Sequence, residues 1–166
     1  VDLSLAADLF FFLTSASNDR EKLIKRLLDD WLEHSAGGSI ILTPTQEDAD
    51  HLNKLCHERR YAQAQVDWEQ KLRRGEKIAL TVGGITLVGG ERIRFLHGSN
   101  GHGISANEIA TVLSPDPERG TFEAYLHRSK RRVAIAEAQQ VAFKLEYATT
   151  MRNAISQKNE AERVYL

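Results

Sequence analysis

The densest set of side chains that could do chemistry is a basic run, His127-Arg128-Ser129-Lys130-Arg131-Arg132. It falls between two predicted strands, where we expect an exposed loop. Four cations so close together could neutralise phosphates and give salt-sensitive binding that does not depend on base sequence. Tyr125 nearby could stack on a base, whereas Phe122 and Phe143 are expected in the core. The alternative interpretation is that the run is only a solvated loop.

Chemistry on nucleotides requires a phosphate-binding loop that this sequence lacks. The pattern G-x-x-x-x-G-K-[ST], which cradles nucleotide phosphates, occurs nowhere in the chain. We therefore expect no ATP hydrolysis by these residues alone. Spacing also identifies no Ser/His/Asp or Cys/His set, so the sequence predicts no catalytic residue and no cofactor.

The histidines do not predict a metal site. His51, Cys56 and His57 fall on one predicted helix, but their spacing does not place three ligands on one face. His97 and His102 flank a Gly-rich loop that no helix follows, which argues against a phosphate cradle.

Charge is distributed unevenly along the 166 residues, although the net charge is only −1. Residues 1–58 hold 5 Lys/Arg and 11 Asp/Glu, a net charge of −6, whereas residues 59–166 hold 17 and 12, a net charge of +5. This asymmetry fits a basic surface that binds nucleic acid and an acidic surface that faces solvent or a protein partner. Ordinary surface charge explains the asymmetry equally well.

The sequence favours a cytoplasmic location. The single cysteine, Cys56, excludes an internal disulfide and fits a reducing compartment. The apolar stretch at residues 9–13 is far shorter than the roughly 20 residues that span a membrane, and acidic residues precede it. We therefore expect neither membrane insertion nor a signal peptide. Because the chain begins at Val1 without methionine, we expect a piece of a larger protein.

Residues 1–76 predict helices around one α/β unit. Residues 3–13 could form a short apolar helix, and a second helix is predicted to end at Gly37-Gly38. A strand over residues 39–43 follows, and then a helix capped by Thr45. The apolar stripe of the second helix comprises Leu23, Ile24, Leu27, Leu28, Trp31 and Leu32.

Residues 77–148 predict a small antiparallel β-barrel. Short runs of β-type residues alternate with Gly and Pro, and strands so short and so closely spaced favour a barrel over parallel units. The polar residues 62–76 before them could be a helical linker. The predicted strands are Ile78–Val82, Ile85–Val88, Glu91–Leu96, Glu108–Leu113, Thr121–Leu126, Arg132–Ile135 and Val141–Leu145, with Pro115-Asp116-Pro117 as a break.

Two motifs resemble those of RecD-type superfamily 1 DNA helicases, closest to the helicase half of conjugative relaxases. In that family a Gly-Asp-Arg-Val/Ile segment enters a small barrel, and the chain leaves it through Tyr-Ala-x-Thr-x-His-Lys-x-Gln-Gly. This chain has Gly90-Glu91-Arg92-Ile93 and later Tyr147-Ala148-Thr149-Thr150. The resemblance covers roughly residues 20–166. It implies a mixed α+β and α/β fragment: part of a RecA-like motor lobe, an inserted SH3-like barrel at residues 77–148, and a return to the lobe at residues 149–166.

The resemblance also implies a DNA-binding set. In such helicases, threonines of the second motor lobe grip the phosphates of single-stranded DNA, and short hydroxyl side chains can do so without reading bases. The alternative is that Thr45 is only a helix cap, and that Thr149 and Thr150 are only strand residues. With the basic residues, the set is Thr43, Thr45, Arg92, Arg128, Lys130, Arg131, Arg132, Thr149, Thr150 and Arg152.

Three departures from the family pattern imply a loss of coupling to ATP. Arg152, Ile155 and Ser156 stand where the family has its His, Gln and Gly. The family also has a barrel loop, Gly-Val-x-Asn-Gly-x-x-Gly-Thr-Val, whose Asn-Gly pair is Ala106-Asn107 in the matching segment, residues 103–112. Gly adopts positive φ at the lowest cost in conformational energy, so this change puts the usual turn geometry in question.

The resemblance implies a fragment of a conjugative relaxase-helicase that binds single-stranded DNA and has no ATPase activity of its own. ATP and Mg²⁺ would be bound by the parent protein, and the remaining helicase and relaxase domains would be its partners. The alternative function is a protein-recognition module, a translocation signal that docks the relaxase onto a coupling protein of type IV secretion.

Overall fold

The computed structural model describes residues 17–34 and 40–156, which form two units. The first unit contains the described residues up to Arg59 and those from Tyr147 onwards, and the second runs from Arg60 to Glu146. The second unit therefore includes the segment 62–76 that the sequence suggests as a linker. The predicted helix at residues 3–13 and the predicted helix end at Gly37-Gly38 lie outside the described residues.

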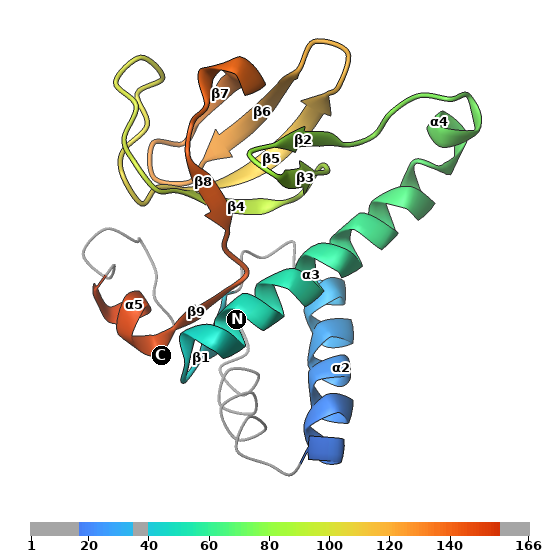
Figure 1. The fold of residues 1–166 in the computed structure, drawn as a ribbon, viewed down its shortest axis with the longest axis vertical. Helices are drawn as coiled ribbons and strands as arrows, with labels where there is room; N and C mark the ends of the chain where they lie inside the picture. Colours follow the sequence, from blue (N-terminus) through green and yellow to red (C-terminus); the bar gives the residue numbers. More distant parts are fainter. Residues whose placement is uncertain (1–16, 35–39, 157–166) are drawn as a thin grey trace. The chain divides into compact units, whose positions relative to one another are not determined.

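The first unit is built from helices around two short parallel strands. Its helix α2 buries four residues of the predicted apolar stripe, Ile24, Leu27, Leu28 and Trp31, while Leu23 and Leu32 are half-buried. Strand β1 pairs in parallel with β9, although more than 100 residues separate them in sequence. The elements are α2 (Ser17–His34), β1 (Ile41–Thr43), α3 (Gln46–Asp67), β9 (Ala148–Thr150) and α5 (Met151–Ser156). Figure 1 shows the chain passing from β8 into β9 beside β1.

Helix α3 continues through the boundary between the units and is followed by the short helix α4 (Glu69–Arg73). The predicted helical character of residues 62–76 is thus confirmed for most of the segment. Two hydrogen bonds of the i,i+4 type, Gln63 to Asp67 and Arg73 to Glu69, stabilise this polar stretch.

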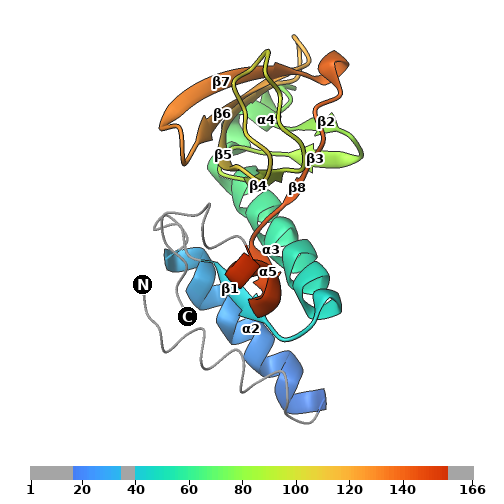
Figure 2. The same cartoon turned by 90° about the vertical axis from the view of Figure 1, so that its left-hand side faces the viewer.

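The second unit has an open five-stranded antiparallel sheet in the order β7-β6-β5-β4-β8. A separate hairpin, β2 with β3, turns at Gly83-Gly84, where both glycines have positive φ as a tight hairpin requires. Figure 2 shows this hairpin beside the sheet. The elements are β2 (Leu80–Val82), β3 (Ile85–Leu87), β4 (Arg92–Phe95), β5 (Ile109–Asp116), β6 (Thr121–Leu126), β7 (Arg131–Ala136), the 3₁₀ turn η2 (Glu137–Gln139) and β8 (Phe143–Leu145).

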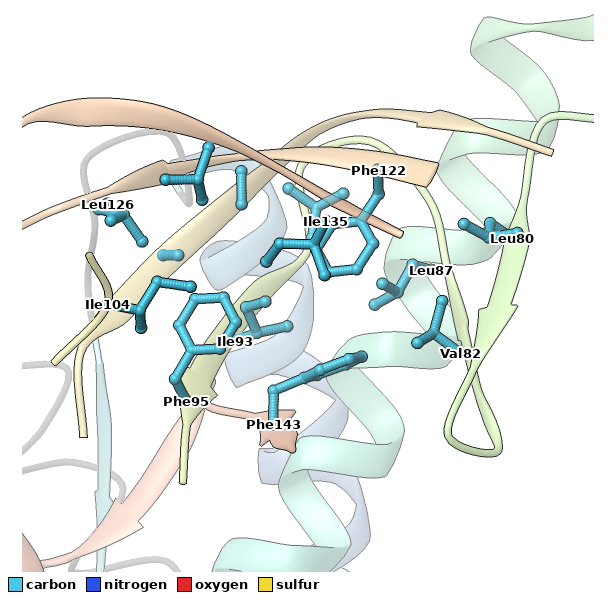
Figure 3. Packing of buried hydrophobic residues seen from close by; sticks show 14 residues of the cluster. Leu80, Val82, Leu87, Ile93, Phe95, Ile104, Phe122, Leu126, Ile135 and Phe143 are labelled. Atoms are coloured by element: carbon cyan, nitrogen blue, oxygen red, sulfur yellow. The ribbon is translucent and has the colours of Figure 1, made fainter. Parts of the chain in front are cut away.

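One core lies between the sheet and the hairpin. Alternate residues of the strands face it, so that Phe122, Ala124 and Leu126 of β6 are buried while the residues between them are not. The rings of Phe95 and Phe122 both meet Phe143 edge to face, with centroids 6.4 and 5.8 Å from it. Figure 3 shows these rings with the hairpin residues Leu80, Val82 and Leu87 closing the cluster. The predicted core positions Phe122 and Phe143 are confirmed.

All seven predicted strands of this unit are present, but two features differ from the prediction. Among the described residues the hydrogen bonds define an open sheet with edges at β7 and β8, and no closed barrel. The prediction of a closed barrel is therefore wrong. A sequence of short strands does not show whether the first and last strands of the sheet will pair. Pro115 was expected to break a strand yet lies in β5 opposite Phe122. Pro115 lies beyond the end of the β4 ladder and next to the irregularity between Val112 and Ser114, a place where a strand tolerates proline.

Asn53 of α3 attaches the start of β9 to the first unit. Its buried side-chain oxygen accepts the backbone N–H groups of Tyr147 (2.7 Å) and Ala148 (2.8 Å), and its nitrogen donates to the carbonyl of Ala148 (2.9 Å). The ring of Tyr147 packs edge to face against Trp31 of α2 at 5.1 Å. These contacts fix where the chain returns after residues 60–146.

Replacing Asn53 with Ala is expected to lower the free energy of unfolding by about 2 kcal/mol or more. The change leaves two buried N–H groups without their acceptor, and each such loss costs about 1–3 kcal/mol. Urea denaturation measures the change, and hydrogen exchange of a peptide covering residues 147–150 should accelerate. Lys54→Ala, on the exposed side of the same helix, is the control and should stay within about 0.5 kcal/mol of the unchanged chain. Equal stabilities for the two variants would contradict this role of Asn53.

Candidate nucleic-acid interface

The parallel pairing of β1 and β9 brings the four predicted threonines to one edge of the first unit. Thr43 stands opposite Thr150, and Leu42 stands opposite Thr149. Each strand is followed at once by a helix, because α3 begins at Gln46 and α5 begins at Met151. The carboxyl ends of two parallel strands and the first turns of two helices therefore share this edge, which we call the threonine edge (residues 43–46 and 149–153).

Most hydroxyl groups of the threonine edge serve the fold. Thr43 is fully buried and donates to the carbonyl of Thr45 at 2.9 Å. The hydroxyl oxygen of Thr150 accepts the N–H of Asn153 at 3.1 Å and so caps α5. Thr45 accepts the N–H of Asp48 at 3.2 Å, which confirms it as the cap of α3, and its hydroxyl donates to the Asp48 carboxylate at 2.7 Å. Thr149 is also buried, so only Thr45 of the four presents an exposed side chain.

A side-chain contact joins the first turns of the two helices. Asn153 donates from its amide to the amide oxygen of Gln46 at 3.1 Å, across 107 positions of sequence. Arg152 and Met151 are exposed beside it. The first turn of α3 carries Glu47 and Asp48, which repel anions, whereas the first turn of α5 has no acidic residue. Of the exposed side chains of this edge, only that of Arg152 carries a positive charge.

The basic run of the second unit is split between a turn and a strand. Residues 127–130 form the turn between β6 and β7, with Lys130 at φ 52°, whereas Arg131 and Arg132 are the first residues of β7. The prediction of a loop is therefore wrong for Arg131, whereas Arg132 lies in the strand that was predicted to begin there, and both side chains are exposed. Strand pairing extends to Leu126 opposite Arg131, because the alternation of buried residues in β6 continues to the end of that strand.

Arg131 forms hydrogen bonds with the neighbouring loop that contains His102 and Gly103. Its guanidinium donates to the carbonyls of His102 (2.6 Å) and Gly103 (2.5 Å). Gly103 has φ 64°, and a Cβ atom at this position would overlap the guanidinium of Arg131. Arg132 is also exposed, but it forms only a long ion pair with Glu123 at 3.4 Å. Of these two arginines, Arg132 is the better candidate for contact with a ligand.

A buried carboxylate, Glu108, shapes the basic turn, and sequence reasoning missed it. One carboxylate oxygen accepts the N–H (3.1 Å) and the hydroxyl (2.7 Å) of Ser129, and the other accepts the N–H of Ser105 at 3.1 Å. Glu108 is 1% exposed, so these donors replace water around its charge. The sequence signal is weak: a Glu at the start of a strand, with serines in two loops.

The loop before β5 keeps a tight turn despite its lack of an Asn-Gly pair. Asn107 has φ 61°, the left-handed conformation that Asn tolerates better than most residues. Its side-chain oxygen accepts from Arg94 at 2.6 Å, and Arg94 in turn forms a buried ion pair with Glu146 at 3.2 Å. This hydrogen bond, which a Gly at position 107 could not form, supports the turn.

His127 lies between the basic turn and the sheet. Its Nε2 is 2.8 Å from the hydroxyl oxygen of Thr111. Burial lowers the pKa of His127 below its usual value, and the nearby Arg92 lowers it further, while Glu108 opposes both. The imidazole is therefore neutral at pH 7. Arg92 itself is half-buried on the same side of the sheet.

Within residues 17–34 and 40–156, no group of three His, Cys, Asp or Glu side chains could hold a metal ion. No helix there is both long enough and apolar enough to cross a membrane.

Comparison with known proteins does not assign the chain to a family. No family model matches it, and no curated protein matches it either. The function must therefore be argued from the residues of the two units.

The lowered pKa of His127 predicts a loss of stability on acidification. Because the folded chain binds this proton less tightly than the unfolded chain, stability should fall as the pH drops below about 6.5, the usual pKa of the unfolded residue. Thermal unfolding of His127→Gln between pH 7.5 and pH 5.5 should show a smaller fall than the unchanged chain. His51→Gln, at an exposed position of α3, is the control. A nuclear magnetic resonance titration that gives His127 a pKa above 6.5 would contradict the assignment.

Proposed function

We propose that this chain is part of the second motor lobe of a RecD-type superfamily 1 helicase, closest to the helicase half of conjugative relaxases. It binds single-stranded DNA and has no ATPase activity of its own. The observation that carries the proposal is the parallel pairing of β1 with β9 on either side of residues 60–146. A motor lobe interrupted by an inserted unit requires such a return to the strand that the chain left.

The proposal also identifies each of the two units with a part of the helicase. Two parallel strands, each followed by a helix, are the repeating unit of a RecA-like lobe. The inserted unit is proposed to be a divergent SH3-like barrel whose strands have opened into a sheet covered by the β2–β3 hairpin. Gly90 precedes β4, and Arg92 and Ile93 are its first residues, so the matching motif stands at the first strand of the five-stranded sheet.

Phosphate contact is assigned to exposed polar and cationic side chains in both units. Arg152 and Thr45 provide it at the threonine edge, and Arg128, Lys130 and Arg132 provide it at the basic turn and β7. Arg131 is assigned a structural role, because its Nη2 already donates to two backbone carbonyls. These contacts reach the backbone of the strand and not base edges, so the binding is independent of sequence.

Coupling to ATP is proposed to be weak or absent. Ile155, at the position of the family's Gln, is 56% exposed and offers no hydrogen bond to a nucleotide or to another lobe. The chain has no phosphate-binding loop, so ATP and Mg²⁺ would be held by other parts of the parent protein. We place the parent in the cytoplasm, with its remaining helicase and relaxase domains as partners.

A protein-recognition module is the second candidate function. Three large apolar side chains, Val66, Trp68 and Leu72, are exposed within seven residues at the end of α3 and in α4. Exposed apolar residues grouped in this way are typical of surfaces that bind another protein. In this function the chain is a translocation signal that docks the relaxase onto a coupling protein of type IV secretion. A translocation signal needs no affinity for an oligonucleotide, so a DNA-binding measurement distinguishes this function from the first one.

A salt titration tests DNA binding. Fluorescence anisotropy with a labelled oligothymidine should give an affinity that falls steeply with salt, because each neutralised phosphate releases counterions. Arg128→Ala and Arg132→Ala should each reduce the slope of log K against log salt by about 0.7. Arg73→Ala, an exposed arginine of α4, is the control and should leave the slope unchanged. Absence of binding at low salt would refute the proposal and favour the recognition function.

A further inference from the structure

The outer face of the five-stranded sheet carries a row of four side chains across four strands. In register, Arg92 of β4 is opposite Thr111 of β5, Thr111 is opposite Tyr125 of β6, and Tyr125 is opposite Arg132 of β7. Neighbouring strands lie about 4.8 Å apart, so the row extends over about 14 Å. We call these four residues the outer row.

The outer row faces away from the core. Side chains alternate along a strand, and at least one neighbour of each member of the row is buried in the cluster of Figure 3. Ile93 follows Arg92, Ala124 precedes Tyr125, and Val133 follows Arg132. Tyr125 is 36% exposed and Arg132 is exposed, so the middle and one end of the row are open to solvent.

The chemistry of the outer row is an aromatic ring between two cations. His127 extends it, because its ring centroid is 6.2 Å from that of Tyr125, and its bond to Thr111 holds the imidazole in place. The ion pair of Arg132 with Glu123 is exposed and long, and such pairs stabilise a protein by less than about 1 kcal/mol. A phosphate can therefore displace Glu123 from Arg132.

The position of the row is rigid. β6 and β7 pair over six residues on each strand, from Thr121 opposite Ala136 to Leu126 opposite Arg131. Glu108 holds the turn that follows β6 through its two bonds to Ser129. A ring presented by a paired strand loses little conformational freedom when a ligand binds, which favours affinity.

We propose that the outer row is a stacking platform for single-stranded DNA. One base stacks on the ring of Tyr125, and the phosphates on either side contact Arg92 and Arg132. Every base has a π face, so this contact suits a strand of any sequence. The inference rests on the proposed function and adds to it a binding mode, base stacking, that phosphate contacts alone do not include.

Oligonucleotides with and without bases test the platform. Fluorescence anisotropy compares oligothymidine with an abasic strand of equal length. Tyr125→Ala should weaken binding of oligothymidine on the order of ten-fold and leave binding of the abasic strand unchanged. Tyr125→Phe keeps the ring and should bind as the unchanged chain does. Tyr125→Leu keeps apolar bulk without the ring and should behave like Tyr125→Ala, which separates stacking from any effect of Ala on folding.

Trp68→Ala provides the matched control, because Trp68 is an exposed aromatic residue outside the sheet. The affinity of this variant for oligothymidine should equal that of the unchanged chain. If the chain binds oligothymidine and Tyr125→Ala binds it as tightly, the platform is overturned while the proposed function stands. An equal loss for oligothymidine and the abasic strand would also overturn it. If the unchanged chain binds neither strand at low salt, both the platform and the proposed function fail.

Discussion

The parallel pairing of β1 with β9 is the constraint on which the rest of the structure depends. It requires the chain to leave the first unit after β1 and to return, beyond residue 146, to the strand that it left. Closing so long a loop costs entropy, and Asn53 and the Trp31–Tyr147 contact offset part of that cost where the chain returns. The threonine edge exists only because of this pairing.

In the second unit, buried polar groups define the turns around an apolar core. Glu108 joins two loops, and Arg94 links Asn107 to Glu146. Burying these charges costs free energy unless each is paired and hydrogen-bonded, so such groups specify particular turn geometries more than they add stability. As a result, the side chains of the outer row have fixed positions on the sheet, and the basic turn between β6 and β7 lies beside them.

Local features of the fold followed from the sequence, and long-range ones did not. Alternation in β6 and the apolar stripe of α2 predicted elements and core positions, since both depend on neighbouring residues. The resemblance implied only a return of the chain to the first lobe, and the pairing of β1 with β9 was not predicted, because no local pattern encodes a contact across 100 residues. Burial of Thr43, Thr149 and Thr150 was not foreseen, since a threonine in a short strand is equally compatible with exposure. The left-handed Asn107 and the strand position of Pro115 depended on partners elsewhere in the sheet.

The central claim is that this chain grips single-stranded DNA with its own exposed side chains in both units. Hydrogen exchange with and without a saturating oligothymidine tests it most directly, because it locates the contact without altering any residue. The account predicts slower exchange in peptides covering residues 121–132 and 149–153, and unchanged exchange at residues 62–74. Protection confined to residues 62–74, or no protection at all, would contradict it.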